Sequence, residues 1–248
     1  MLKAAIDRIL SLSAPNITEV NGEQYADKKL ERIPRALRAC PMEVHTLTAI
    51  LDYITSGTDD NNEQTDINNR FVLHIADYDQ VVLTRELDAD RCREDLLIAC
   101  DLNEKFPFGR WFSVEEFIIF VQSHFVMDDT VAALVKLVSS VTDSNSVHQS
   151  DNGLSQSVTA RTGIVTQGKV EVPNPVTLRP LCTFSEIEQP ARRFVFRLRP
   201  GRSEVDGVQA ALFDADGTAW RREAILSIRD WFTDKLPDEL RDEVIILA

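Results

Sequence analysis

Two aspartates near the C-terminus have the residue type and spacing that phosphoryl-transfer chemistry requires. Asp214 and Asp216 follow an apolar run in the segment Leu212-Phe-Asp-Ala-Asp-Gly-Thr218. One carboxylate can attack phosphorus to form an aspartyl phosphate, a second can act as general acid and base, and a magnesium ion can offset the charge. The alternative is a strand that ends in an Asp-Gly turn before a helix, with both carboxylates solvated.

This segment resembles the first motif of the haloacid-dehalogenase-like phosphatases, an apolar strand followed by Asp-x-Asp-Gly-Thr. The resemblance implies that Asp214 is the nucleophile and Asp216 the general acid/base, with magnesium bridging them to the phosphate. Only 30 residues follow Thr218, whereas that family places its lysine and second acid pair well downstream. We therefore expect the turn, and keep a magnesium-dependent phosphohydrolase as the alternative.

The second candidate is a basic strand with the sequence RRFVFRLR, residues Arg192–Arg199. Alternation predicts one face of Phe194, Phe196 and Leu198 and an opposite face of Arg193, Arg197 and Arg199. Guanidinium groups bind phosphate and carboxylate through paired hydrogen bonds, so this row suits an anionic ligand or nucleic acid. Arg161 and Arg179 are expected on neighbouring strands. The alternatives are a solvated face neutralised by the acidic part of the chain, and a contact with another subunit.

The basic strand lies in a segment whose charge is opposite to that of the whole protein. The protein is acidic, with a formal net charge of −13. Residues 154–202 nevertheless contain eight basic and three acidic side chains, a local net charge of +5. A local basic strip in an acidic protein is a more specific signal for an anionic partner than the total charge.

Other site chemistries find little support in the sequence. The cysteines and histidines show no paired spacing, so we expect no disulfide framework, no metal site and no cofactor. They are Cys40, Cys92, Cys100, Cys182, His45, His74, His124 and His148. No apolar run approaches the roughly 18 residues of a membrane span. The charged N-terminal segment MLKAAIDRILSLS predicts an amphipathic helix rather than a secretory signal, which favours the cytoplasm.

The clearest structural signal is the segment Trp111–Phe125, WFSVEEFIIFVQSHF. Ser113 and Glu116 have the spacing of a capping box, which marks the start of a helix. Its apolar residues recur at helical spacing, so we expect Phe117 and Val121 to be buried.

The remaining patterns predict alternating short elements. Strands are expected at Ile17–Val20, Arg70–Ala76, Gln80–Leu87, Asp95–Cys100 and Val244–Leu247, and helices at 41–56, 130–138 and 219–236. Period-two segments begin near residue 158 and predict an antiparallel sheet.

Together these elements predict an α+β fold: an N-terminal α/β part joined by a central amphipathic helix to an antiparallel β-rich C-terminal part with a terminal helix. We expect an acidic part at 1–141 that includes the helix 113–125, a polar segment at 142–157, and a C-terminal part at 158–248. The polar segment is either a linker or a β-arm.

The order of these segments resembles that of the YfdQ-like family of phage and prophage proteins of unknown function. The segments concerned are the hairpin Phe71–Leu87, the helix Phe112–Phe125, the polar segment Ser139–Ser157 and the β-rich end. The resemblance implies a phage gene expressed early, among those for DNA replication and recombination, and supplies no site residues. We expect a non-enzymatic intracellular binding protein that acts in early phage DNA metabolism or against a host system, with a protein partner or self-association. A virion structural component is the further alternative.

Overall fold

The computed structural model describes residues 3, 17–20, 22–27, 38, 40–56, 70–88, 91–142, 148–151, 156–161, 167–172, 174–201 and 207–248. The chain forms two compact units, Met1–Arg38 and Ala39–Ala248. In the first unit, strands β1 (Ile17–Val20) and β2 (Glu23–Ala26) form an antiparallel hairpin. Gly22 lies in its turn with φ of 83°, a conformation that favours glycine. The predicted strand is confirmed, whereas the predicted N-terminal helix lies, except for Lys3, outside the described residues.

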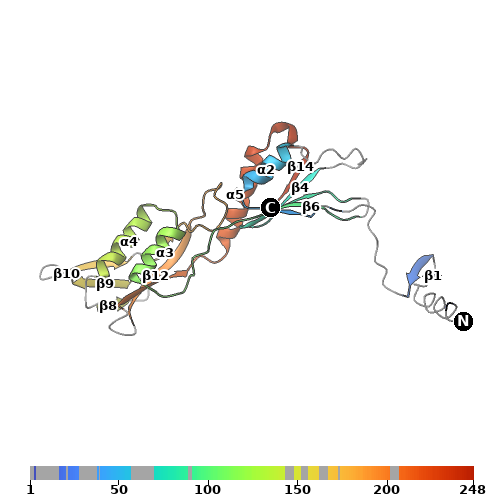
Figure 1. Cartoon of the computed structure of the whole chain (residues 1–248). Coiled ribbons are helices and arrows are strands. Elements are labelled where there is room, and N and C mark those ends of the chain that lie inside the picture. Colours follow the sequence, from blue (N-terminus) through green and yellow to red (C-terminus); the bar gives the residue numbers. More distant parts are fainter. Residues whose placement is uncertain are drawn as a thin grey trace. The chain divides into compact units, whose positions relative to one another are not determined.

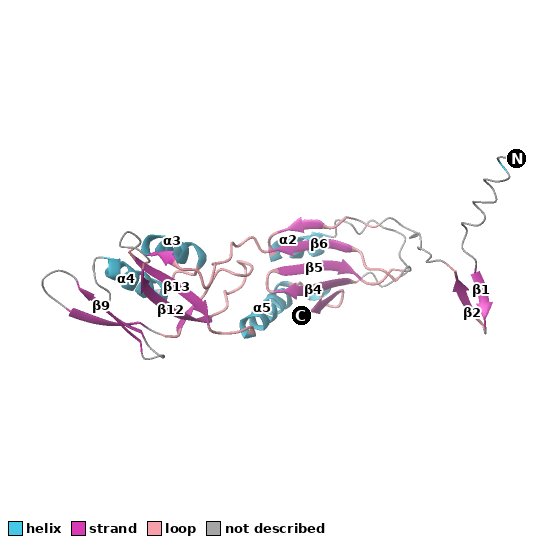
Figure 2. Cartoon of the chain, turned by 90° about the horizontal axis from the view of Figure 1, so that it is seen from below, coloured by secondary structure: helices cyan, strands magenta, loops and turns pink. Residues whose placement is uncertain are grey.

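The second unit contains a five-stranded mixed sheet in the order β14-β4-β5-β6-β3 (Figures 1 and 2). Its strands are β3 (Met42–Val44), β4 (Phe71–Asp77), β5 (Gln80–Arg85), β6 (Asp95–Cys100) and β14 (Val244–Leu247). The predicted hairpin β4–β5 and strand β6 are confirmed. The outer strands β14 and β3 pair in parallel with β4 and β6, whereas the inner pairs are antiparallel.

Helices α2 (Leu47–Ser56) and α5 (Ala219–Lys235) pack against one face of this five-stranded sheet. Leu47, Ile50 and Ile54 recur at helical spacing on α2 and are all buried. The expectation that α2 begins at Pro41 is wrong. Residues Met42–Val44 instead form the edge strand β3, because their backbone groups pair with β6.

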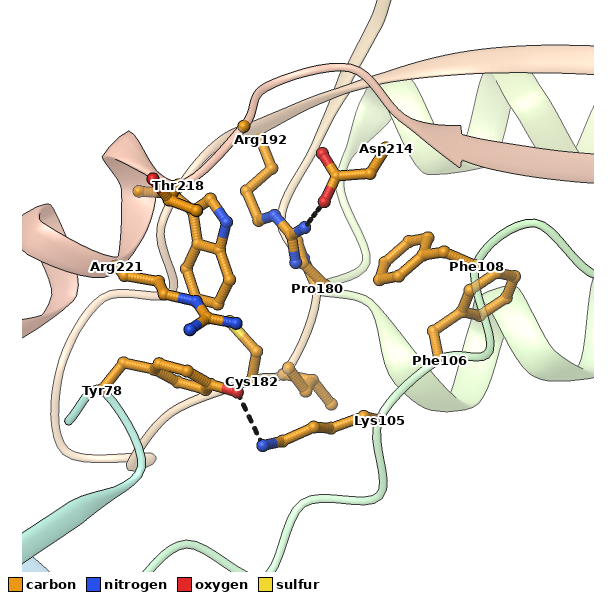
Figure 3. Close-up of a pocket in the computed structure, with 13 residues that line it drawn as sticks. Tyr78, Lys105, Phe106, Phe108, Pro180, Cys182, Arg192, Asp214, Thr218 and Arg221 are labelled. Carbon is orange, nitrogen blue, oxygen red and sulfur yellow. Dashed lines mark hydrogen bonds and ion pairs between the residues drawn. The ribbon is translucent and has the colours of Figure 1, made fainter.

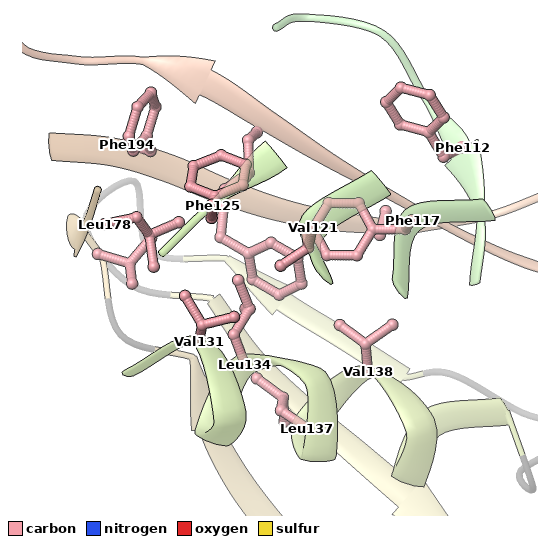
Figure 4. Packing of buried hydrophobic residues seen from close by; sticks show 14 of the residues in the cluster. Phe112, Phe117, Val121, Phe125, Val131, Leu134, Leu137, Val138, Leu178 and Phe194 are labelled. Carbon is pink, nitrogen blue, oxygen red and sulfur yellow. The ribbon is translucent and has the colours of Figure 1, made fainter. Parts of the chain in front are cut away.

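A second sheet has the antiparallel order β11-β12-β13-β7. Its strands are β7 (Phe112–Ser113), β11 (Val176–Leu178), β12 (Arg192–Pro200) and β13 (Val208–Asp214). Helices α3 (Val114–His124) and α4 (Asp129–Thr142) lie together against one face of it (Figure 4). Phenylalanines from both helix and sheet fill the space between them, so aromatic packing dominates this core.

The central helix α3 confirms the predicted start signal. The Ser113 hydroxyl accepts a hydrogen bond from the Glu116 backbone N–H, and the Glu116 carboxylate accepts one from the Ser113 backbone N–H at 3.0 Å. Phe117 and Val121 are fully buried in the core with Phe125 (Figure 4). The predicted helix at 130–138 is confirmed as part of α4.

The polar segment leads into a third, three-stranded antiparallel sheet in the order β10-β9-β8. Its strands are β8 (His148–Asp151), β9 (Gln156–Arg161) and β10 (Gln167–Val172). Strand β8 falls within the polar segment 142–157 and pairs with β9.

The α+β fold class is confirmed, but the packing does not divide the chain at 142–157. Helix α5 packs on the five-stranded sheet and strand β14 is part of it, although both lie at the end of the predicted C-terminal part. Helix α3, predicted to join the N-terminal part to the antiparallel part, does pack on the antiparallel second sheet. The physical reason is that β14 completes the backbone pairing along β4, and α5 buries Ile228 and Phe232 over the same sheet.

Candidate nucleic-acid interface

Strand β12 has the alternation that its sequence predicts. Phe194, Phe196 and Leu198 are at most 1% exposed and belong to the core under α3 and α4. The residues between them point to the other face of the second sheet. This places Arg193, Arg197 and Arg199 on that face, which we call the basic face.

Aromatic side chains lie beside the arginines on the basic face. On β13, Phe213 is the register partner of Val195, and its ring meets that of Trp111 edge-on at 5.8 Å. The Arg199 guanidinium lies over Trp111, 4.1 Å from the ring centroid, and its Nε donates to Gln209 Oε1 at 2.9 Å. Arg199 is therefore held in place by Gln209 on β13 and by Trp111, which directly precedes β7.

Few carboxylates compete for these arginines. Arg193 is largely exposed and lies 3.9 Å from the Asp216 carboxylate, at the outer limit of an ion pair. Arg197 donates only a long 3.5 Å contact to the backbone carbonyl of Phe196. Within the described part of the chain, neither Arg197 nor Arg199 forms an ion pair.

The other two candidate arginines do not join the row. Arg179 follows β11 and pairs with Glu188, with 2.6 Å between the charged atoms. Arg161 ends β9, which belongs to the three-stranded sheet and not to the sheet of β12. The basic face thus consists of Arg193, Arg197, Arg199, Trp111 and Phe213. The sequence spacing along β12 predicted that the three arginines share a face. The position of Trp111 and Phe213 beside them could be seen only from the pairing register of the strands.

Asp214 and Asp216 form a turn, but they are not both simply solvated as we expected. The Asp214 carboxylate forms an ion pair with Arg192 (Figure 3). It also accepts a hydrogen bond from the Asp216 backbone N–H at 3.0 Å. Arg192 is only 5% exposed. The sequence contains a signal for this burial, because Arg192 alternates in phase with the buried Phe194 and Phe196. Gly217, with φ of 65°, completes the predicted Asp-Gly turn before α5.

This arrangement gives Asp214 a structural partner. Both of its oxygens are engaged, and β13 lies between antiparallel neighbours. Within the described residues, no group of three or more His, Cys, Asp or Glu side chains could hold a metal ion. Asp214, the nucleophile of the phosphatase alternative, is thus paired with Arg192. The described residues do not supply the ligands for the magnesium ion that this alternative requires.

Comparison with family models, with curated proteins and with solved structures found no match to the chain. Among the described helices, none combines the length and apolar character needed to cross a membrane.

Proposed function

We propose that the protein binds nucleic acid, and that the basic face holds a single strand. The observation that carries this proposal is the row of three arginines flanked by Trp111 and Phe213 on the face of the second sheet opposite α3 and α4. The proposed activity is binding and not catalysis.

The spacing of the row suits a sugar-phosphate backbone. Alternate residues of a strand lie about 6–7 Å apart, so the separation of Arg197 and Arg199 is close to that of successive phosphates in an extended single strand. Val195 lies between Arg193 and Arg197 on the same face, so Arg193 is placed to contact a phosphate one position further along. Arg197 and Arg199 need not break an ion pair with a described carboxylate before they bind phosphate. The contact of Arg199 with Gln209 and Trp111 pre-orders its long side chain, which reduces the entropy lost on binding.

The shape and the aromatic residues favour a single strand over a duplex. Duplex DNA is commonly read by a helix or ribbon that enters a groove, whereas unpaired bases stack on aromatic rings and guanidinium planes of a sheet. Trp111 and Phe213 are half-buried and adjoin the arginines. They can contribute stacking beside the phosphate contacts.

The setting of this activity rests on the resemblance to YfdQ-like proteins. That resemblance predicts a phage-encoded protein in the host cytoplasm, acting in early phage DNA metabolism or against a host system. A protein partner or self-association remains part of this prediction. A virion structural component would instead be found in purified particles.

Fluorescence anisotropy with a labelled oligothymidine tests the proposal. The test variant is Arg193→Ser/Arg197→Ser/Arg199→Ser, and the matched control is Arg222→Ser/Arg229→Ser/Arg241→Ser. The control removes the same charge from exposed positions on α5 and after it. We expect the wild-type affinity to fall steeply with salt, since each phosphate contact to a single strand adds roughly 0.7 to the slope of log K against log salt.

The test variant should lose binding, or bind with a salt slope smaller by about 2, whereas the control should keep the wild-type slope. Trp111→Phe should also remove any quenching of tryptophan fluorescence by the oligonucleotide, which Trp231→Phe should retain. Equal binding by the two triple variants would contradict the proposal. A lower melting point or altered mass in the test variant, without an effect on binding, would identify a contact within the protein or with a second copy.

A further inference from the structure

A cavity of about 290 Å³ lies between the five-stranded sheet and the second sheet. Five chain segments line it: the β4–β5 turn at Tyr78, the loop 105–108, the loop 180–182, Arg192 at the start of β12, and residues 214–221 from the end of β13 to the start of α5. Three cationic side chains, Lys105, Arg192 and Arg221, extend into this region (Figure 3). A concentration of positive charge in a cavity suggests an anionic ligand.

Arg192 supplies the most specific evidence. It is 95% buried, and its Nη2 is committed to Asp214. Its Nε is also buried but has no hydrogen-bond partner within the described residues. Because an unsatisfied buried donor costs free energy, a ligand oxygen at this position would be stabilised.

Arg221 is the cation least engaged by the protein. Its guanidinium lies 5.2 Å from the Tyr78 ring centroid and 5.6 Å from that of Trp220. Within the described part of the chain it has no carboxylate partner. It comes from the first turn of α5, whose Thr218 N-cap makes no side-chain capping hydrogen bond. The positive end of the helix therefore adds to the field of Arg221.

Lys105 remains charged in the folded protein. Burial opposes its charge, but hydrogen bonds to the Asp79 carboxylate and to the Tyr78 hydroxyl outweigh this effect and raise its pKa. Of the three cations, Lys105 and Arg192 already have a carboxylate partner, and Arg221 does not. The cavity therefore carries a small excess of positive charge, which suits a group with one or two negative charges.

We infer that this cavity binds a compact oxyanion, namely inorganic phosphate or the phosphate group of a small ester. The aromatic rings do not favour a flat ligand, because the protein's own cations occupy their faces. Arg192 lies 4.1 Å from the centroid of Trp220, and Lys105 lies 4.7 Å from that of Tyr78. The volume is also at the lower end of the range of about 300–1,000 Å³ for ligand pockets.

The cavity favours binding over covalent chemistry. Cys182 lines it, but burial raises the pKa of this thiol to about 11, so the nucleophilic thiolate is scarce at neutral pH. Lys105 is protonated, and Asp214 is held by Arg192. This oxyanion site is separate from the basic face, since it uses none of Arg193, Arg197 or Arg199.

Isothermal titration with inorganic phosphate tests this inference, with sodium chloride at the same ionic strength as the blank. The test variant is Arg221→Gln, and the matched control is Arg222→Gln, an exposed neighbour on the same helix that does not line the cavity. We expect Arg221→Gln to weaken phosphate binding about tenfold or more, because it removes a charge-assisted contact. Arg221→Lys should recover part of the affinity, and Arg222→Gln should match the wild type.

Two further arms separate the sources of the oxyanion. Glycerol phosphate competing with phosphate would identify a phosphate ester as a ligand, whereas binding of phosphate alone would restrict the site to the free ion. Melting curves without phosphate establish that each variant is folded. Two results would overturn the inference. One is that addition of phosphate and addition of chloride give equal heats. The other is that folded Arg221→Gln binds phosphate as well as the wild type does. The triple serine variant of the basic face should still bind phosphate, so the two proposals can fail independently.

Discussion

The two larger sheets of the protein are built alike but present different open faces. Each has two helices on one face, α2 and α5 on the five-stranded sheet, α3 and α4 on the second sheet. On the other face of the five-stranded sheet, the register aligns His74, Val82 and Ile98 in one row. The corresponding face of the second sheet carries Arg193, Arg197 and Arg199.

This difference separates what the fold needs from what the surface does. Both sheets bury an apolar core on the helix side, so neither needs arginines on the other side for its core packing. Long charged side chains in a row, beside the half-buried rings of Trp111 and Phe213, are instead available to a partner. The comparison therefore supports the proposal that the basic face of the second sheet, and not the five-stranded sheet, binds the partner.

Phe117→Ala tests whether the two sheets fold as one unit. Phe117 is fully buried, and truncation of a large core side chain costs about 3–5 kcal/mol. Because Ala39–Ala248 is one compact unit, we expect a single urea transition shifted to lower concentration. Trp111 beside the second sheet and Trp231 on α5 should report the same midpoint. Two separate midpoints would show that the sheets are independent domains.

Asp214→Asn tests the ion pair at the junction between the sheets. The sequence alone predicted a turn with both carboxylates solvated, but the structure shows the buried Arg192 bound to Asp214. Removing one partner of a buried pair leaves an uncompensated charge, and the partial exposure of Asp214 moderates the cost to about 1–3 kcal/mol.

Asp216→Asn is the matched control, because its contact with Arg193 is long and Arg193 is largely exposed. We expect it to change the free energy of unfolding by less than about 0.5 kcal/mol. Urea denaturation of both variants measures the difference. Equal stabilities would show that the Arg192–Asp214 pair contributes nothing to the junction.

Local patterns in the sequence predicted the elements of both sheets well. Period-two alternation predicted the hairpin β4–β5, and a capping box predicted α3. Each of these signals is local, because the residues that make it up lie close together in the sequence. The alternation of β12 likewise placed three arginines on one face. These predictions needed no information about distant parts of the chain.

Long-range pairing could not be predicted in the same way. Strand β3 pairs with β6 across more than 50 residues, and β14 joins β4 from the far end of the chain. The oxyanion cavity needs five segments that only the fold brings together. Arg192 was missed although a local signal for it exists: it shares the phase of the buried Phe194 and Phe196 on β12, and a buried arginine requires a partner.

Ser113→Ala compares the starts of two helices that cover different sheets. On α3, the Ser113 hydroxyl caps the helix, and loss of such a cap costs about 1 kcal/mol. On α5, the Thr218 side chain makes no capping hydrogen bond, so Thr218→Ala should have a smaller effect. Thermal melts of the two variants measure the difference. A larger loss from Thr218→Ala would reverse this comparison of the helix starts.

The smallest expected effect is the pH dependence of the α3 cap. Hydrogen bonds from the Ser113 backbone N–H and hydroxyl lower the pKa of Glu116 below its ordinary value of 4.5. The unfolded chain thus takes up the proton at a higher pH than the folded chain. The stabilisation is therefore fully present above pH 4.5 and is lost as the pH falls through the lowered pKa.

Melting temperatures of the wild type and Glu116→Gln, measured from neutral to acidic pH, test this cap. We expect the wild type to be more stable at neutral pH and the difference to shrink below pH 4.5. Glu115→Gln is the matched control, because Glu115 is exposed in the same first turn but does not take part in the capping box. Both substitutions remove a negative charge from the helix start, so the general dipole effect cancels between them. Identical pH profiles for the two variants would show that the carboxylate of Glu116 acts through the dipole alone and not through its bonds to Ser113.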